Sequence, residues 1–229
     1  MPLPQMDGVV DTQIDSSGNY LNVRMTKNLV AALTSCPPSH FTFISSIDVY
    51  DPSVFAQSVT EKAELSPATE YGKSKLESEQ VVEDWARVLD ITPLILRVTQ
   101  IYGEKDRTRK LIPSVISRIK DGKAVQLFGD GSDLRDYIYS RDVARLALEL
   151  HKKNASGIYN LTTGQSRSLE EVIGQLICIS GEKVEIEYHE RSKKRVDYRF
   201  DCRKVASILP DFEFTDFKKS LRDTYDHMS

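Results

Sequence analysis

Cysteine is scarce in this chain, and the cysteines present follow no metal-binding pattern. The 229 residues include three cysteines, Cys36, Cys178 and Cys202, an odd number without a CxxC pair. The four histidines are scattered along the chain. This composition argues against a zinc site, and we expect no metal site in a protein of a reducing compartment.

The chain also lacks an excess of basic charge and any long apolar run. Its formal net charge is −3, which gives no basic surface for nucleic acid or for a membrane. No stretch approaches the roughly 18 apolar residues that cross a bilayer, and the N-terminus does not resemble a signal peptide. We therefore expect a soluble, cytoplasmic protein that binds neither nucleic acid nor membranes.

Short β-branched or aromatic runs alternate with longer helical patterns along the chain. Such alternation predicts an α/β fold with a parallel sheet, and the length fits one large domain or two small lobes. The predicted strands are 8–10, 41–46, 93–98, 125–128, 157–161 and 184–188. The predicted helices are 20–33, 66–89, 111–123, 140–153 and 168–180, followed by two short helices near 201–209 and 215–226.

The stretch "SPATEYGKSKLESEQ", residues 66–80, places Tyr71 and Lys75 one helical turn apart. A tyrosine serves as an acid–base near neutral pH only if its pKa of about 10 is lowered, and a nearby ammonium group lowers it. Ser46 ends a predicted strand, and ligands of doubly wound sheets bind beyond the carboxyl ends of the strands. The alternatives are a chance pairing of Tyr71 with Lys75 and a capping or turn role for the two serines Ser45 and Ser46.

Five motifs then appear in a fixed order along the chain. They are "FISSIDVY", "YGKSK", "LRVTQIYG", "LFGDGSDLRDYIYSRDVA" and "GIYNLTTGQSRSLEEV". Together they resemble the NAD-dependent epimerase/dehydratase family, the extended short-chain dehydrogenases that act on nucleotide sugars. The resemblance runs from about residue 15 to the end, and it implies a Rossmann-like, doubly wound sheet with a smaller C-terminal α/β substrate lobe.

The resemblance implies a catalytic set of three residues. Tyr71 matches the acid–base of the family, and Lys75 matches the lysine that lowers its pKa and holds the nicotinamide ribose. Ser46 matches the serine or threonine that orients the sugar oxygen. Alongside Tyr71 and Lys75, the resemblance places Asn22, Ser45 and Thr99 at the NAD or NADP cofactor.

Four further residues are expected at the nucleotide-diphosphate sugar. Arg135 resembles an arginine that contacts the diphosphate, and Arg195 is similar to a second, more loosely aligned one. Guanidinium groups suit phosphate oxygens, although a solvated surface arginine is the alternative, above all for Arg195. Gln100 stands in place of a usual asparagine near the phosphates. Asp48 follows Ile47 where dehydratases of the family carry an Asp-Glu pair, so dehydration is disfavoured.

A glycine-rich turn for the dinucleotide is missing from the sequence. None of the eleven glycines has the GxxGxxG spacing with which the family holds the pyrophosphate. By resemblance, the chain starts at the fourth strand of the family, so the sheet is incomplete and that strand becomes a new edge. There are three explanations for the missing turn: an incomplete copy of a longer enzyme, a chain completed by a partner, or a degenerate relative with another function.

The sequence thus predicts an NAD(P)-dependent nucleotide-sugar epimerase or, second, a 4-keto reductase. The alternative is a catalytically silent protein that binds a nucleotide sugar or a partner protein. Residues 1–103 are expected to form the truncated Rossmann-like part, with 136–155 packing back on it, and 104–229 mainly the substrate lobe. The resemblance also implies a homodimer through the tyrosine-bearing helix.

Overall fold

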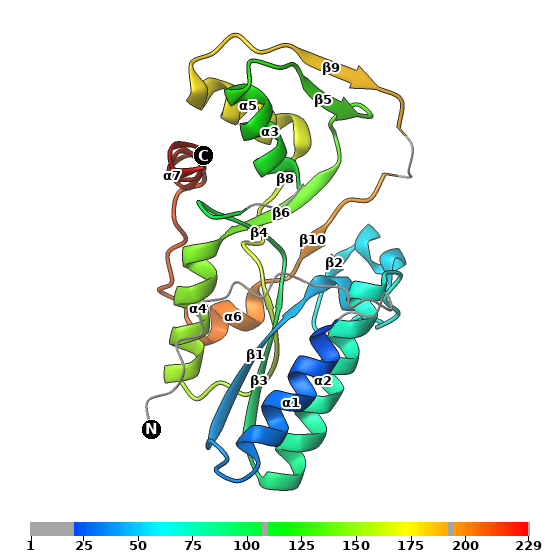
Figure 1. The fold of residues 1–229 in the computed structure, drawn as a ribbon, viewed down its shortest axis with the longest axis vertical. Helices are drawn as coiled ribbons and strands as arrows, with labels where there is room; N and C mark the ends of the chain where they lie inside the picture. Colours follow the sequence, from blue (N-terminus) through cyan, green and yellow to red (C-terminus); the bar gives the residue numbers. More distant parts are fainter. Residues whose placement is uncertain (1–20, 107–109, 192–194, 229) are drawn as a thin grey trace.

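The computed structural model describes residues 21–106, 110–191 and 195–228 (Figure 1). The helices are α1 (Leu21–Leu33), α2 (Glu70–Leu89), α3 (Leu111–Lys120), α4 (Ser140–Lys152), α5 (Leu169–Ser180), α6 (Arg203–Ile208) and α7 (Phe217–His227), with the 3-10 turns η1 (Ile47–Val49) and η2 (Pro52–Ala56). The strands are β1 (His40–Ser46), β2 (Ser58–Val59), β3 (Thr92–Val98), β4 (Gln100–Tyr102), β5 (Val125–Phe128), β6 (Leu134–Tyr139), β7 (Gly157–Leu161), β8 (Ser166–Ser168), β9 (Ile186–His189) and β10 (Arg199–Phe200). The strand predicted at 8–10 lies outside the described residues.

A parallel sheet of order β1-β3-β7 forms the lower part of the molecule in Figure 1. Its strands end level with one another, because Ser46 aligns with Val98 and Val98 with Leu161. Among the described strands, β1 lies at one edge of this sheet. The carboxyl ends of the three strands therefore form one rim, where ligands of such sheets bind.

The two faces of β3 meet different helices. Leu94, Leu96 and Val98 are buried in a core with residues of α4 and α6. Arg97 points to the other face, where it pairs with Glu79 of α2. Figure 1 shows α1 and α2 running side by side along the sheet, and α4 on its other side. Helices on both faces are the arrangement that parallel sheets require.

The upper part of the molecule is built from the sheet β4-β6-β8 and the pair β5-β9, covered by α3, α5 and α7 (Figure 1). Its core contains Ile116 of α3, Leu176 of α5 and Leu221 of α7, all almost fully buried. The strand β6 was not among the predicted strands. Its sequence, "LRDYIY", places two charges among tyrosines, and the burial that stabilises it comes from the long-range packing of the lobe.

The helix α2 begins later than predicted. Thr69 is its N-cap and accepts a hydrogen bond from the amide of Gly72 at 3.0 Å, so residues 66–69 precede the helix. At the other end, Asp90 adopts a left-handed conformation with φ 53°. The predicted cap of α5 is confirmed, because Ser168 accepts a hydrogen bond from the amide of Glu171.

A segment near the C-terminus, residues 199–208, returns to the lower part. β10 pairs with β2 in parallel, with Phe200 beside Val59, and Phe200 is buried with Val49 and Phe55 in a small core. Val205 of α6 is buried in the core of the lower sheet. The division of the chain near residue 103 stays a prediction, and residues 199–208 pack with the first part. Among the described helices, none has both the length and the apolar character of a membrane span.

Candidate functional site

Ser45 and Ser46 end β1, and their hydroxyl groups have different partners. The Ser45 hydroxyl donates a hydrogen bond to the Glu79 carboxylate in the interior. The Ser46 hydroxyl accepts one from the amide of Asp48 at 3.2 Å and caps the turn η1. Adjacent strand residues point to opposite faces, which separates the two serines. Ser46 therefore lies at the rim of the sheet, whereas Ser45 is held by a buried carboxylate.

The first turn of α2 touches the turn that follows Ser46. Gly72 is buried, and a Cβ atom there would clash with the carbonyl oxygen of Asp48 and lie 2.8 Å from the Cβ of Pro67. Only glycine permits such a close approach of the two backbones. Tyr71 immediately precedes Gly72, so it lies at the junction between α2 and the end of β1.

The Lys75 side chain lies beside Tyr71 and the edge of β1. Its Nζ atom is 6.0 Å from the centre of the Tyr71 ring and 5.3 Å from that of Phe43, and it donates a hydrogen bond to the Ile44 carbonyl at 3.1 Å. Burial lowers the pKa of the Lys75 amine, and the charge of Glu79 acts in the opposite direction. An ammonium group is thus present near the Tyr71 ring, on a side chain that is partly buried.

Asn22 of α1 is connected to the same turn of α2. Its Nδ2 atom donates to the Ser74 hydroxyl at 3.1 Å, and that hydroxyl donates to the Tyr71 carbonyl at 2.8 Å. Asn22 therefore supports the backbone between Tyr71 and Lys75. This is the part of α2 that the sequence assigned to the acid–base pair.

Asp48 lies next to Ser46 in η1 and is partly buried. Burial raises the pKa of its carboxyl group, while the charge of Lys110 and the hydroxyl of Ser46 lower it. Lys110 directly precedes α3, so Asp48 faces the upper part of the molecule. A carboxyl group with a raised pKa at a rim is suited to proton transfer.

Thr99 and Gln100 lead from β3 into β4. The Thr99 hydroxyl donates to Asp136 at 3.2 Å, and Asp136 also accepts hydrogen bonds from Thr162 and Thr163. Thr99 thus helps to satisfy a fully buried carboxylate. Gln100 aligns with Tyr137 of β6.

The two predicted phosphate-binding arginines are engaged by protein groups. Arg135 donates to the carbonyl oxygens of Leu134 and Val196 and stacks on the Tyr198 ring, with 4.5 Å from its guanidinium carbon to the ring centre. Arg195 forms two hydrogen bonds of 2.9 Å with Asp197, which raises the pKa of its guanidinium group. Both arginines belong to the strip where β6 runs beside residues 195–198.

The structure thus gathers part of the predicted set. Ser46, Asp48, Tyr71, Lys75 and Asn22 lie around the junction of β1 and α2. Ser45 and Thr99 use their hydroxyl groups in buried contacts, and the two arginines border the strip at residues 195–198. The described residues contain no cluster of histidine, cysteine and carboxylate side chains that could hold a metal ion.

A family model matches residues 7–162, and its description is "NAD dependent epimerase/dehydratase family". The chain belongs to this family. The membership confirms the resemblance seen in the motifs, and the match ends just after β7, at the last strand of the lower sheet.

Individual relatives also support the family membership. The chain is 28% identical to the low-salt glycan biosynthesis protein Agl12 of Haloferax volcanii, over 94% of this chain and 72% of the relative. It is 27% identical to the dTDP-glucose 4,6-dehydratase of Haemophilus influenzae, over 96% of this chain and 70% of the relative. The chain thus spans about 70% of the length of these two family members.

Solved structures confirm the predicted fold class. The UDP-glucuronic acid 4-epimerase of Bacillus cereus, solved with NAD, superimposes with a TM-score of 0.81 at 24% identity, over 91% of this chain and 68% of that chain. The fold of this chain is therefore the Rossmann-type α/β fold that the motifs indicated.

A buried ion pair between Glu79 and Arg97 was missed at the sequence level. Their side chains are 2% and 1% exposed, and Arg97 Nη2 lies 2.7 Å from Glu79 Oε2. The signal was present, because Arg97 interrupts the apolar run "PLILRV" of a predicted buried strand. A buried arginine requires an opposite charge nearby, and Glu79 lies one turn beyond Lys75 on α2.

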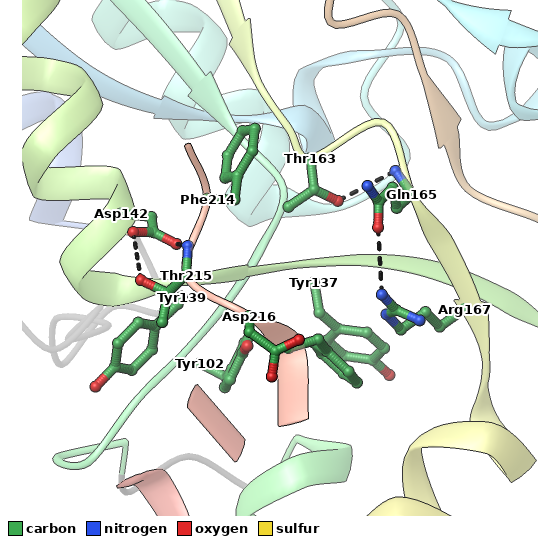
Figure 2. Close-up of a pocket in the computed structure, with 11 residues that line it drawn as sticks. Tyr102, Tyr137, Tyr139, Asp142, Thr163, Gln165, Arg167, Phe214, Thr215 and Asp216 are labelled. Atoms are coloured by element: carbon green, nitrogen blue, oxygen red, sulfur yellow. Dashed lines mark hydrogen bonds between the residues drawn. The ribbon is translucent and has the colours of Figure 1, made fainter. Parts of the chain in front are cut away.

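A cavity of about 330 Å³ lies between β4, β6 and the segment that leads into α7 (Figure 2). Figure 2 shows Tyr102, Tyr137 and Tyr139 along it, with Asp142 hydrogen-bonded to Thr215. Its volume is in the range of ligand pockets, but Asp142 and Thr215 lie on one side of it and hydrogen-bond each other. None of the predicted site residues lines this cavity, which is the seam where α7 joins the sheet.

Proposed function

We propose that this chain is an NAD(P)-dependent nucleotide-sugar epimerase or, second, a 4-keto reductase. The observation that carries the proposal is the contact between the first turn of α2 and the turn after Ser46. It joins the backbone beside Tyr71 to the turn that follows Ser46, and the Lys75 amine lies 6.0 Å from the centre of the Tyr71 ring, which supports a shared site for the three groups. A hydroxyl, a phenol and an ammonium at one rim are suited to moving a proton to and from a sugar oxygen.

The surroundings of Lys75 fit the nicotinamide end of a dinucleotide. Its side chain is partly buried and lies at β1, an edge among the described strands, where Ile44 is 40% exposed. Lys75, Tyr71 and Asn22 are the residues that would hold the nicotinamide ribose. Ser45 and Thr99 remain weaker candidates, because their hydroxyl groups already donate hydrogen bonds to Glu79 and Asp136. When bound, the nicotinamide accepts and returns a hydride.

Tyr71 accepts the proton of the reacting sugar hydroxyl as the carbon is oxidised, and it returns this proton on reduction. Lys75 favours the charged form of the phenol, because its ammonium lies close to the ring. Ser46 orients the sugar oxygen from the end of β1. In an epimerase, the keto sugar exposes its other face to reduction, so the configuration at that carbon inverts.

The substrate we propose is a nucleotide-diphosphate sugar. A relative acts on dTDP-glucose, which supports this class of substrate. We place Asp48, Gln100, Arg135 and Arg195 at the substrate, with the arginines at the diphosphate. Dehydration is the less favoured reaction, because Ile47 is 4% exposed and packs in an apolar core beside the single carboxylate of Asp48.

Turnover of a panel of UDP- and dTDP-sugars with NAD and NADP tests the proposal. We expect Tyr71→Phe to abolish turnover and to retain the wild-type circular dichroism spectrum. Tyr188→Phe is the matched control, since Tyr188 is an exposed tyrosine in β9. Near-normal turnover by Tyr71→Phe would remove this phenol from the reaction.

A silent nucleotide-sugar-binding protein is the second candidate, and it is supported by the Ser45 and Thr99 hydroxyls, which donate hydrogen bonds to buried carboxylates instead of facing a cofactor. Isothermal titration separates the two candidates. An enzyme binds NAD or NADP as well as a nucleotide sugar, whereas the silent protein binds at most the sugar nucleotide. Heat from the sugar nucleotide alone, with none from either dinucleotide, would support the silent protein.

A further inference from the structure

The Glu79 carboxylate accepts hydrogen bonds from two strands of the parallel sheet. Arg97 of β3 donates to it through Nε at 3.0 Å and through Nη2 at 2.7 Å, and the Ser45 hydroxyl of β1 donates to its Oε1 atom. All three side chains are buried. The carboxylate therefore ties α2 to both neighbouring strands at the end where the predicted catalytic groups lie.

Arg97 is fixed from its other side as well. Its guanidinium carbon lies 4.9 Å from the centre of the Tyr50 ring, and the Tyr50 hydroxyl donates to Asn160 of β7 at 2.7 Å. These contacts extend the network across all three strands of the sheet. Glu79 is thus held in one position by partners that cannot easily move.

The predicted catalytic residues flank this carboxylate on both sides. Ser45, which donates to Glu79, is adjacent in the chain to Ser46. Lys75 lies one helical turn before Glu79, and the charge of Glu79 opposes the effect of burial on the pKa of the Lys75 amine. One buried carboxylate thus acts on the strand that bears Ser46 and on the lysine beside Tyr71.

We propose that Glu79 is a positioning residue, which holds the end of β1 through Ser45 and places a negative charge one helical turn from Lys75. This inference rests on the proposed function of Ser46, Tyr71 and Lys75. A purely structural pair could be replaced by apolar side chains at little cost, since burying two charges is expensive. If Glu79 has a positioning role, we therefore expect its replacement to shift the titration of Lys75 in a variant that still folds.

Other charged groups near the pair bear on the design of a test. Glu83 lies one turn beyond Glu79 on α2, and its pKa is raised by burial and by Glu79. On the other side of Arg97, the backbone carbonyl of Glu61 accepts a hydrogen bond at 3.5 Å. Neither Glu83 nor Glu61 is among the causes that shift the pKa of Lys75. Glu83→Gln is therefore a matched control that removes the same charge from the same helix.

The experiment follows the titration of Lys75 in the full chain, without dinucleotide or sugar. Lysine amines are labelled by reductive ¹³C-methylation, and the Lys75 signal is assigned as the one lost in Lys75→Arg. The test variant is Glu79→Gln combined with Arg97→Met, which leaves no unpaired buried charge. We expect its Lys75 signal to titrate at lower pH than in the wild type, with no shift in Glu83→Gln.

An unchanged Lys75 titration in the folded double variant would overturn the inference. If the double variant does not fold, Glu79→Asp provides the second test, because it keeps the charge while shortening the side chain. Lys75 should then titrate close to its wild-type pH, and a large downward shift would count against the charge of Glu79. The measurement requires no turnover, so a chain without activity still tests Glu79, and failure of the proposed function is seen separately.

Discussion

The backbone of Gly72 lies against the carbonyl group of Asp48, with room for hydrogen but not for a side chain. A Cβ atom at residue 72 would clash with the carbonyl oxygen and lie 3.0 Å from the carbonyl carbon. The neighbouring residue Tyr71 and the strand-end residue Ser46 are brought to one junction by this contact. The glycine in "YGKSK" is therefore explained by packing, whatever reaction the site performs.

Gly72→Ala should consequently destabilise the protein. The backbone carbonyl of Asp48 cannot rotate away as a side chain could, so α2 must shift from the end of β1. We expect a loss of about 1–3 kcal/mol in the free energy of unfolding, as is usual for overpacking, together with loss of turnover. Chemical denaturation measures the first effect.

Gly174→Ala is the control for this change. Gly174 lies within α5, and a Cβ atom there would meet no atom within 4 Å. Alanine favours a helix over glycine, so we expect a gain of about 0.4–1 kcal/mol. Equal effects of the two substitutions would contradict the close contact at Gly72.

Lys75→Met should separate stability from function. Burial lowers the pKa of the Lys75 amine in the folded state, so the unfolded chain binds this proton more tightly. The charged lysine therefore costs stability at neutral pH, and that cost disappears as the pH rises past the unfolded pKa of the amine. We expect Lys75→Met to be more stable than the wild type at pH 7, by about 0.5–2 kcal/mol, and inactive.

Lys73→Met on the same helix is the comparison. The Lys73 side chain is 57% exposed and pairs only with Glu70 on the surface, so its removal should change stability little. Thermal melts at pH 7 and pH 10 test both variants. A stability gain in Lys75→Met that does not shrink at the higher pH would contradict the burial of the charge.

Asp48→Asn should alter the dependence of stability on pH in one direction, and Asp51→Asn in the other. Burial raises the pKa of Asp48, so the wild type loses stability as the pH rises above the unfolded value near 3.8. Hydrogen bonds from Ser53 lower the pKa of Asp51. The ionised Asp51 carboxylate therefore stabilises the folded state at neutral pH, and this stabilisation is lost on acidification. Relative to the wild type, Asp48→Asn should gain stability between pH 3 and pH 7, while Asp51→Asn should lose it. Denaturation across this range that shows the same sign for both would contradict the two environments.

Much of the fold follows from the sequence, because β3 contains the apolar run at Leu94–Leu96 and α5 begins at the predicted serine cap, Ser168. The strand β5 has the predicted bounds, 125–128. The strand β6 was missed, since its charged residue Asp136 is buried only through contacts with Thr99, Thr162 and Thr163, which are distant in the chain. Local patterns cannot show such partners.

Contacts between residues distant in the chain also limit what the sequence predicts about the site. Residue spacing and family motifs placed Tyr71 and Lys75 on one turn, and the turn exists because Thr69 caps the helix. They assigned Ser46 to the catalytic set and Ser45 to the cofactor, but they could not show that the Ser45 hydroxyl bonds the buried Glu79, which lies 34 residues further along the chain. The contacts of Arg135 likewise depend on a segment some 60 residues further along the chain.

Two tyrosines of the upper core provide a matched pair for a last prediction. The Tyr102 hydroxyl shares a 2.6 Å hydrogen bond with Ser220 of α7. The Tyr137 hydroxyl is buried without a hydrogen-bond partner among the described residues, and Tyr137 is 6% exposed. Ser220 keeps its hydrogen bonds to the carbonyl oxygens of Asp216 and Phe217, so Tyr102→Phe loses one hydrogen bond and should cost about 0.5–1.5 kcal/mol. Removing a hydroxyl without a partner removes the cost of burying an unbonded polar group, so Tyr137→Phe should be neutral or slightly stabilising. Denaturant midpoints of the two variants measure the difference, and a larger loss in Tyr137→Phe than in Tyr102→Phe would show that the Tyr137 hydroxyl has a partner in solution.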